Sequence, residues 1–360
     1  MIENMRNPLL AILSVLFVTL SCGRNNFIEG VPVETVRAGQ VLSLDRDTLF
    51  TCDFSECLQC VDLSVESDSV LVLREMENSS PDFRYFKCWS LTDFSYLGGY
   101  VFHGRGPGEV LMPDFIGGFV SGEGTRKVSG IADISLKKVF SVDFPLSAVS
   151  GEAVIRQTGR LPSNTMYVRP YGEERLYVEC VDNDRLVCRL TDMDCNILKD
   201  FEVYGDIPAM SCAARLSHCL VVNQENGLVA SLMISLPQIN ILDLESGNIS
   251  SYASGEEFRD WKEIIRPVNP NTAMDMKEYY LNADSSNDYI FVLYAGVSRA
   301  ELDGREDTHL HVYDWSGRFL YDITLSEVID AISFDEKTEM LYALDRNANR
   351  IYRYDLSELI

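Results

Sequence analysis

The segment 103–109 has the residue types and spacing best suited to gripping a polar ligand. It reads His-Gly-Arg-Gly-Pro-Gly-Glu. Glycine accepts backbone angles that are closed to other residues and proline fixes one φ, so we expect a rigid loop. Such a loop would hold His103, Arg105 and Glu109 as ligand-binding groups. The alternative is a connection between two structural units in which Arg105 and Glu109 make structural ion pairs. The phosphate-loop pattern, with Gly-Lys followed by Ser or Thr, is absent from it.

Cysteines form a second group whose spacing could carry chemistry. The chain has 10, and four of them cluster in the first third of the chain: Cys52, Cys57, Cys60 and Cys88. The first three are spaced like the ligands of plant-type iron–sulfur clusters, but their neighbours do not match that pattern. A disulfide or a zinc site within this group, or free buried thiols, are the open alternatives. Further on, Cys180 and Cys188 flank a turn and could face each other across a hairpin. We predict no cofactor.

Two of the four histidines could ligate a metal. His309 and His311 alternate along an expected strand and therefore share a face. Spacing identifies no third ligand, so the sequence predicts no metal site. A Gly-x-Ser-x-Gly nucleophile elbow is also absent, and we assign no catalytic residue.

The charge balance excludes one class of partner. The chain has 55 Asp and Glu against 31 Lys and Arg, a net charge of -24. Such a surface repels phosphate backbones, and no basic block interrupts it, so we expect no binding to nucleic acid.

The first 21 residues predict where the protein is located in the cell. Leu9 to Leu20 is an apolar run of 12 residues, too short for a bilayer of about 30 Å but suited to a signal peptide. It leads into Ser21-Cys22, and a small residue before cysteine resembles the lipidation signal of bacterial lipoproteins. Thr19 departs from the leucine usual in that signal. We therefore predict a signal peptide over 1–21, a lipid anchor at Cys22 and a tether over 22–33. Without an acidic cluster after Cys22, we expect an outer-membrane anchor that faces the periplasm.

An internal repeat predicts the elements that position these residues. A short apolar strand that ends in Asp recurs six times, at Asp93, Asp143, Asp192, Asp243, Asp314 and Asp355. The intervals are 50, 49, 51, 71 and 41 residues, and the long one contains a proline-broken insert over 256–280. Turn residues follow most of these aspartates, because an Asp side chain accepts backbone N–H bonds at the start of a turn. We interpret the aspartates as turn formers within β-hairpins.

A period near 50 with several strands per unit predicts propeller blades around a central channel. The fold class is therefore all-β, a six-bladed β-propeller over residues 34–360. The last unit stops after its Asp strand and lacks a final strand. We expect Glu34 to Leu44 to fill that place, so that an N-terminal strand closes the ring and protects its edges. A two-domain sandwich is the rival fold, but it does not explain an even period.

Two stretches resemble a known family. The Gly-Pro-Gly-Glu run that ends at Glu109 resembles a signature of the TolB-like six-bladed propeller lipoproteins of Bacteroides-type bacteria. Residues 289–296, 309–317 and 331–342 are similar to the last two blades of that family. The resemblance implies the propeller fold and an address in the cell envelope. It implies no catalytic residues.

These observations together predict a membrane-anchored, non-enzymatic propeller. Its partners would be the lipid bilayer, through the N-terminal lipid, and a small molecule, glycan or envelope protein bound at the channel mouth. Loops on a rigid scaffold are the usual place for such binding. The alternatives are a metal-dependent propeller hydrolase or lyase, with Ca²⁺ held by channel-facing carboxylates, and a structural subunit of an envelope assembly.

Overall fold

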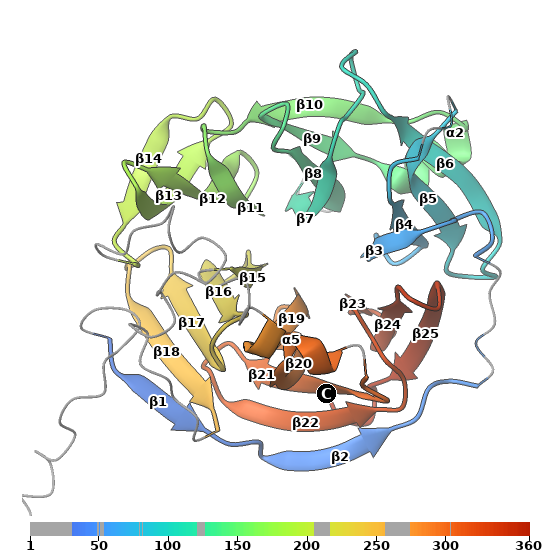
Figure 1. Ribbon diagram of the computed structural model, residues 1–360. Helices are drawn as coiled ribbons and strands as arrows, with labels where there is room; N and C mark the ends of the chain where they lie inside the picture. Colours follow the sequence, from blue (N-terminus) through green and yellow to red (C-terminus); the bar gives the residue numbers. More distant parts are fainter. Residues whose placement is uncertain are drawn as a thin grey trace, which may run out of the picture.

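A computed structural model describes residues 31–48, 50, 54–78, 80, 82–120, 127–204, 217–255, 274–302 and 304–360. Six antiparallel sheets stand around a central axis, so the predicted six-bladed propeller is confirmed (Figure 1). The predicted signal peptide and Cys22 lie outside the described residues, as do Cys52 and most of the insert over 256–280. Within the described ranges, no helix has the length and apolar character needed to cross a bilayer.

The first three blades follow one another along the chain with four strands each. Blade 1 contains β3 (Cys60–Glu66), β4 (Val70–Glu75), β5 (Arg84–Ser90) and β6 (Tyr96–Phe102). Blade 2 contains β7 (Pro113–Val120), β8 (Lys127–Asp133), β9 (Lys138–Val142) and β10 (Ile155–Arg160), with α2 (Phe144–Ser150) before its last strand. Blade 3 contains β11 (Thr165–Tyr171), β12 (Arg175–Asp182), β13 (Arg185–Asp192) and β14 (Ile197–Phe201).

The last three blades differ in their number of strands. Blade 4 contains β15 (His218–Asn223), β16 (Leu228–Met233), β17 (Gln238–Asp243) and β18 (Ile249–Ser254), with β1 (Val33–Val36) at its outer edge. Blade 5 contains β19 (Lys277–Ser285), β20 (Tyr289–Ser298), β21 (Thr308–Asp314) and β22 (Phe319–Leu325), with β2 (Gln40–Leu44) outermost and α5 (Arg299–Leu302) after β20. Blade 6 contains only β23 (Ala331–Asp335), β24 (Met340–Asp345) and β25 (Arg350–Asp355).

The N-terminal strands close the ring, as predicted, but not at the predicted place. We expected Glu34 to Leu44 to complete the last blade, whereas β1 pairs in parallel with β18 and β2 pairs in parallel with β22. Blade 6 therefore has three strands. At the outer edge of β25, in place of a fourth strand, the N–H of Asp47 donates a hydrogen bond to the carbonyl of Arg353 at 2.8 Å. The N-terminal segment packs its apolar side chains against three successive blade interfaces. It therefore acts as an outer belt over the edges of β18 and β22, which would otherwise be open.

Side chains, not a shared strand, join blade 6 to blade 1. Asn349 accepts a bond from the backbone N–H of Cys60 at 3.0 Å and donates one to the carbonyl of Cys57 at 2.9 Å. Ser333 Oγ accepts the N–H of Val65 at 3.0 Å. A buried apolar cluster that includes Trp89 of blade 1 and Tyr342 of blade 6 lies beneath these bonds.

The repeated aspartates form turns, as predicted, with one variation. The carboxylates of Asp192, Asp243 and Asp314 accept backbone N–H groups from residues two to four positions further along the chain, at 2.8–3.0 Å. Asp143 instead caps α2, where its side chain accepts the N–H of Leu146 at 2.9 Å. Each blade therefore reuses the same local chemistry at the same point of its hairpin.

Alternation along each strand sends successive side chains to the two neighbouring blades. In β20, Ile290 and Val292 pack toward blade 4, whereas Phe291 and Leu293 pack toward blade 6. All four are fully buried, which explains why the second strand of a blade is continuously apolar.

The innermost strands have a free edge at the axis, and polar side chains satisfy it. Asn282 and Asp284 of β19 accept the backbone N–H groups of Ile332 and Phe334 at 2.9 and 2.8 Å. Arg169 Nε donates to the carbonyl of Leu220 at 2.7 Å. The channel is polar because these backbone groups need partners.

Candidate functional site

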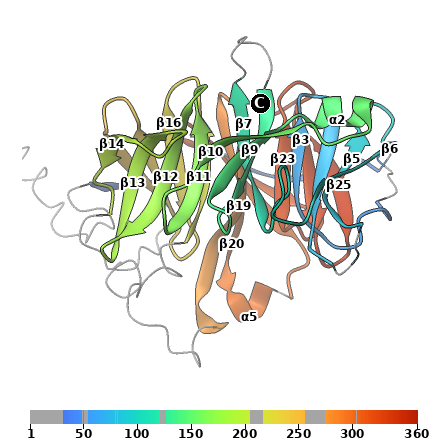
Figure 2. The ribbon, with the colours of Figure 1, turned by 90° about the horizontal axis from the view of Figure 1, so that it is seen from above.

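One end of the ring, which we call the α5 face, gathers the candidate sites. Figure 2 shows α5 below the ends of β19 and β20. Because each four-stranded blade runs antiparallel from the axis outward, the links between blades return to the face where the inner strands begin. The predicted loop over 103–109 is such a link, between β6 and β7, so it also lies on this face.

Two of the three predicted ligand-binding residues, Glu109 and His103, already contact groups of the protein. Glu109 folds back over the loop and accepts the N–H of Gly106 at 2.7 Å, and a Cβ on Gly104 would collide with its carboxylate. His103 Nδ1 lies 2.9 Å from the hydroxyl of Tyr85 and 3.3 Å from a carboxylate oxygen of Glu77. Arg105 is exposed. The structure therefore places His103, Arg105 and Glu109 on one loop without converging them on one point, and their role in binding stays a prediction.

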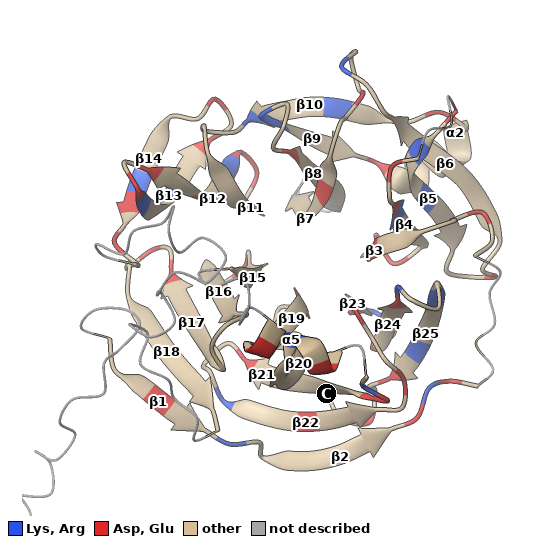
Figure 3. Cartoon of the chain, viewed as in Figure 1, with Lys and Arg blue, Asp and Glu red and all other residues tan. Residues whose placement is uncertain are grey.

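The axis carries charges of both signs. Arg74 Nη2 lies 3.2 Å from Asp114 Oδ1. Burial raises the pKa of Asp62 and of Asp284. Burial also lowers the pKa of Arg169, whereas the negative charges of Asp62, Asp114 and Asp284 raise it. Figure 3 shows red and blue segments together on strands that border the axis. Two arginines among three carboxylates disfavour the predicted alternative of a Ca²⁺ held by channel acids, because Ca²⁺ sites need a surplus of negative oxygen ligands.

A cavity of about 790 Å³ opens between blades 5 and 6 on the α5 face. Its walls come from the start of β19, from α5 and the residues after it, from the β22–β23 link and from the β24–β25 turn. Six of its lining residues are charged: Glu278, Arg299, Arg305, Asp330, Asp345 and Arg346. We call this site the arginine cavity.

The lining carboxylates already have partners within the protein. Asp330 accepts the backbone N–H of Arg346 at 2.8 Å, and Asp345 accepts that of Ala348 at 2.8 Å. Glu278 faces Arg299, with the carboxylate oxygen 3.8 Å from Nε. Each carboxylate of the lining therefore has at least one contact with a protein donor.

Two arginines keep donors for a ligand. Arg305 Nε donates to the carbonyl of Leu302 at 3.1 Å, but its Nη1 is buried without an acceptor among the described residues. Arg346 is exposed at the rim, and its positive charge acts against the burial that raises the pKa of Asp62. A guanidinium fork binds carboxylate or phosphate oxygens in pairs, so this lining suits an anion.

A sequence model of the family described as TolB-like 6-blade propeller-like matches residues 38–337. The chain belongs to the TolB-like six-bladed propeller family. The expected resemblance is therefore confirmed, and the family model covers most of the ring.

The chain is similar to solved structures at low sequence identity, and the first of these shows the same fold. A Bacteroides fragilis protein, described as exported, is 13% identical with a TM-score of 0.54, covering 88% of this chain and 99% of its own. A member of the DUF4221 family from Bacteroides vulgatus is 9% identical with a TM-score of 0.47, covering 92% of this chain and 98% of its own. None of the curated proteins compared with the sequence matches it.

The cysteines of this TolB-like propeller do not converge as the sequence suggested. The seven cysteines in the described ranges are free thiols. The sequence left open that Cys180 and Cys188 face each other. The register instead pairs Cys188 with Glu179 and Cys180 with Val187, so the two point to opposite sides of blade 3. A shift of one residue reverses the side of a strand to which a residue points. Cys57 and Cys60 do lie close together and are buried, and the hydrogen bond between them raises the pKa of Cys60.

Proposed function

We propose that this TolB-like propeller is a lipid-anchored, non-enzymatic envelope protein that binds an anionic ligand in the arginine cavity. The ligand class is a small molecule or short glycan with carboxylate or phosphate groups. The observation that carries the proposal is Arg305, which lines a cavity whose aspartates already accept backbone N–H groups, and whose buried Nη1 has no acceptor among the described residues.

The overall charge strengthens this interpretation. In a chain with a net charge of -24, random placement gives an acidic surface, yet three arginines from two segments line one cavity. Leaving a guanidinium N–H buried without an acceptor is unfavourable by about 1–3 kcal/mol, and an anionic ligand would remove that penalty. The volume lies within the roughly 300–1,000 Å³ of small-molecule sites, which favours a small molecule or short glycan over a protein partner.

The address is the second part of the proposal. A signal peptide over 1–21 would export the chain, and lipid on Cys22 would hold it on the periplasmic side of the outer membrane. The description of the B. fragilis neighbour as exported is consistent with this address. The first described strand, β1, lies on the outer edge of blade 4 and not at the α5 segment (Figure 1). Cys22→Ala should move the protein from the membrane fraction to the soluble fraction, and a variant that stays in the membrane would contradict the anchor.

Binding is tested by calorimetric titration of the full chain with citrate and with tri-galacturonate. We expect both to bind, or the one whose shape fits, while neutral maltotriose does not. Arg305→Ala and Arg346→Ala should each weaken the affinity about 10- to 100-fold, the loss of about 1.5–3 kcal/mol from a charge-assisted hydrogen bond.

Two control variants make the result specific. Arg156→Ala removes the same charge from the exposed surface of blade 2 and should leave the affinity unchanged. Arg305→Lys keeps the charge but loses the fork, so it separates loss of binding from loss of folding. Absence of binding to both probes, or an equal loss in Arg156→Ala, would contradict the proposal.

A further inference from the structure

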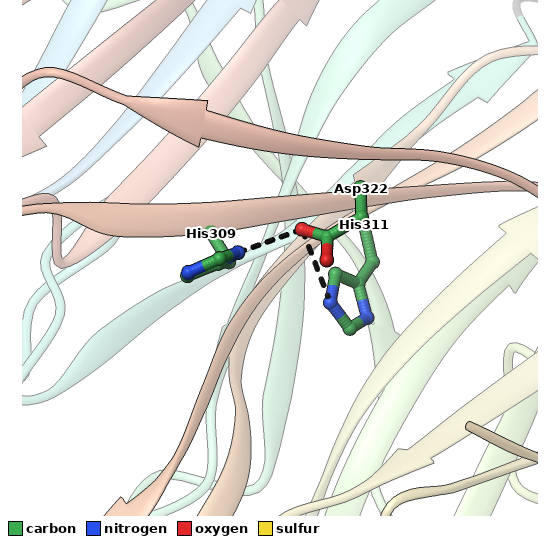
Figure 4. Close-up of side chains that lie close together, drawn as sticks. All are labelled: His309, His311 and Asp322. Carbon is green, nitrogen blue, oxygen red and sulfur yellow. Dashed lines mark hydrogen bonds and ion pairs between the residues drawn. The ribbon is translucent and has the colours of Figure 1, made fainter. Parts of the chain in front are cut away.

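The side of blade 5 that faces blade 4 carries a separate cluster, formed by His309 and His311 of β21 and Asp322 of β22. One ligand atom from each of the three lies within 4.8 Å of the others. Figure 4 shows the carboxylate of Asp322 between the two imidazole rings. Among the described residues, no other group of three His, Cys, Asp or Glu side chains converges in this way. We call it the His–Asp cluster.

The distances suit a shared cation. His311 Nε2 lies 3.7 Å from Asp322 Oδ1, too far for a strong hydrogen bond, and His309 Nδ1 lies 2.7 Å from the same oxygen. Two ligands of a tetrahedral Zn²⁺ with bonds of about 2.0–2.1 Å stand roughly 3.3 Å apart. The distance from His311 Nε2 to Asp322 Oδ1 is already close to that value. The distance from His309 Nδ1 to the same oxygen would have to increase by roughly 0.6 Å.

A β-bulge creates the arrangement. Tyr313 pairs with Phe319, but Val312 pairs with Tyr321, so Leu320 is an extra residue in β22. Without it, His311 would face Tyr321 and Asp322 would point to the other side of the blade. The belt contacts the bulge directly, because Gly39 donates its backbone N–H to the carbonyl of Phe319 at 2.9 Å.

A hydrogen-bonded chain fixes the buried imidazole. Tyr313 OH lies 3.4 Å from His311 Nδ1 and 3.1 Å from Tyr280 OH, which lies 3.0 Å from Ser254 Oγ of blade 4. In the tautomer whose Nδ1–H donates a hydrogen bond to the Tyr313 hydroxyl, His311 Nε2 is unprotonated and faces Asp322. The ring of Tyr294 also stacks on His311, with centroids 4.1 Å apart. Such outer contacts orient metal-ligating histidines in known sites.

The cluster is open on one side. The side chain of His311 is 4% exposed, whereas those of His309 and Asp322 are 40% and 24% exposed. A cation could therefore enter from the His309 side and keep a water molecule as its remaining ligand.

We propose that His309, His311 and Asp322 form a binding site for a divalent transition metal, with Zn²⁺ as the expected ion. Two imidazole nitrogens and one carboxylate oxygen suit Zn²⁺ and its neighbours in the first transition series. They do not suit Ca²⁺ or Mg²⁺, which require mostly oxygen ligands. The inference does not depend on the proposed function, because the arginine cavity lies on the other side of the blade.

The test is a Zn²⁺ titration of the full chain after treatment with EDTA and its removal. We expect one bound equivalent, with a cobalt-substituted form that shows d–d absorption of a four- or five-coordinate site, and no displacement by excess Mg²⁺. His309→Ala and Asp322→Asn, both at the exposed side, should each weaken Zn²⁺ binding at least tenfold. Tyr313→Phe should weaken it about 10- to 100-fold by releasing the imidazole of His311.

Asp307→Asn is the matched control. Asp307 is exposed and acts on His309 only through its charge, so its removal changes the local charge as Asp322→Asn does without removing a ligand. Zn²⁺ affinity should stay within about threefold of the unaltered protein. No stoichiometric Zn²⁺, or equal losses in Asp307→Asn and Asp322→Asn, would overturn the proposal.

Discussion

The two sides of blade 5 carry opposite chemistry. Toward blade 4, the blade presents imidazoles and a carboxylate that converge on a point, as a cation site does. Toward blade 6, it contributes arginines to a cavity whose acids are engaged elsewhere, as an anion site does. The sheet of blade 5 lies between the two sites, because neighbouring residues of a strand point to opposite sides of the sheet.

The two sites also differ in how they are built. The His–Asp cluster comes from two adjacent strands, and its outermost members, His309 and Asp322, are 13 positions apart in the sequence. The arginine cavity needs the β20–α5 segment, the β22–β23 link and the β24–β25 turn, so it exists only when two blades are packed together. The difference teaches that the register of one hairpin determines the first site, whereas blade packing determines the second.

The largest expected effect on stability comes from exchanging two neighbouring residues of β21 that point to opposite sides of blade 5. In the double variant His311→Val with Val312→His, an imidazole enters the fully buried interface with blade 6, and Tyr313 loses its hydrogen bond with His311. Burying the polar ring and removing the hydrogen bond should lower the free energy of unfolding by roughly 3 kcal/mol. Urea denaturation measures this, with Val312→Ala reporting the loss of volume alone. A change below about 1 kcal/mol would show that the sides are interchangeable.

A smaller effect distinguishes a carboxylate at the blade-6 side from one in a turn of the same blade. Burial raises the pKa of Asp284, so the ionised form is unfavourable in the folded state. The contribution of Asp284 to stability is therefore present below the ordinary pKa of about 3.9 and lost as the pH rises through the raised value. Asp284→Asn should become more stable relative to the unaltered protein between pH 4 and pH 7.

The turn residue Asp314 should behave in the opposite sense. Burial alone would raise its pKa, but hydrogen bonds from Ser316 and Arg318 hold it below the ordinary value. Its contribution is present above about pH 3.9 and lost as the pH falls through the lowered value. Asp314→Asn should therefore be less stable at pH 7, with the difference fading on acidification. Parallel pH profiles for Asp284→Asn and Asp314→Asn would contradict the assignment.

The smallest effect is expected at the glycine-rich loop. Glu109→Ala removes the acceptor of the Gly106 N–H and should lower the free energy of unfolding by about 1 kcal/mol, measured by urea denaturation. Citrate affinity should stay within about twofold of the unaltered protein. Arg105→Ala should leave both quantities unchanged. A tenfold loss of citrate affinity in either variant would move the anion site from the arginine cavity to the loop over 103–109.

The blade repeat could be predicted because each hairpin uses the same local device. An Asp that accepts the N–H groups of its own turn leaves a mark in the sequence at five of the six positions, and Asp143 fulfils the same role at a helix. The closing strands could be predicted only in part. Their apolar residues suit the outer edge of any blade, and the sequence holds no signal that selects β18 and β22 over β25.

The candidate sites were mostly beyond the sequence. Spacing suggested that His309 and His311 share a face, and counting back from the turn at Asp314 is the signal that could have found a third ligand. A count without the bulge, however, places Tyr321 opposite His311 and hides Asp322. Arg305 and Arg346 are separated by four strands, two of blade 5 and two of blade 6, and belong to no motif. Glu109 looked like a ligand because the sequence cannot show that a carboxylate folds back on its own loop.

The most direct test of the two-sided blade is a crystal of the full chain soaked with Zn²⁺ and selenate. Anomalous scattering at the two absorption edges locates each ion independently. We predict a zinc peak bounded by His309, His311 and Asp322 and a selenate peak beside Arg305 and Arg346. Zinc absent from the His–Asp cluster, or selenate bound beside Arg105 and not in the arginine cavity, would contradict the account.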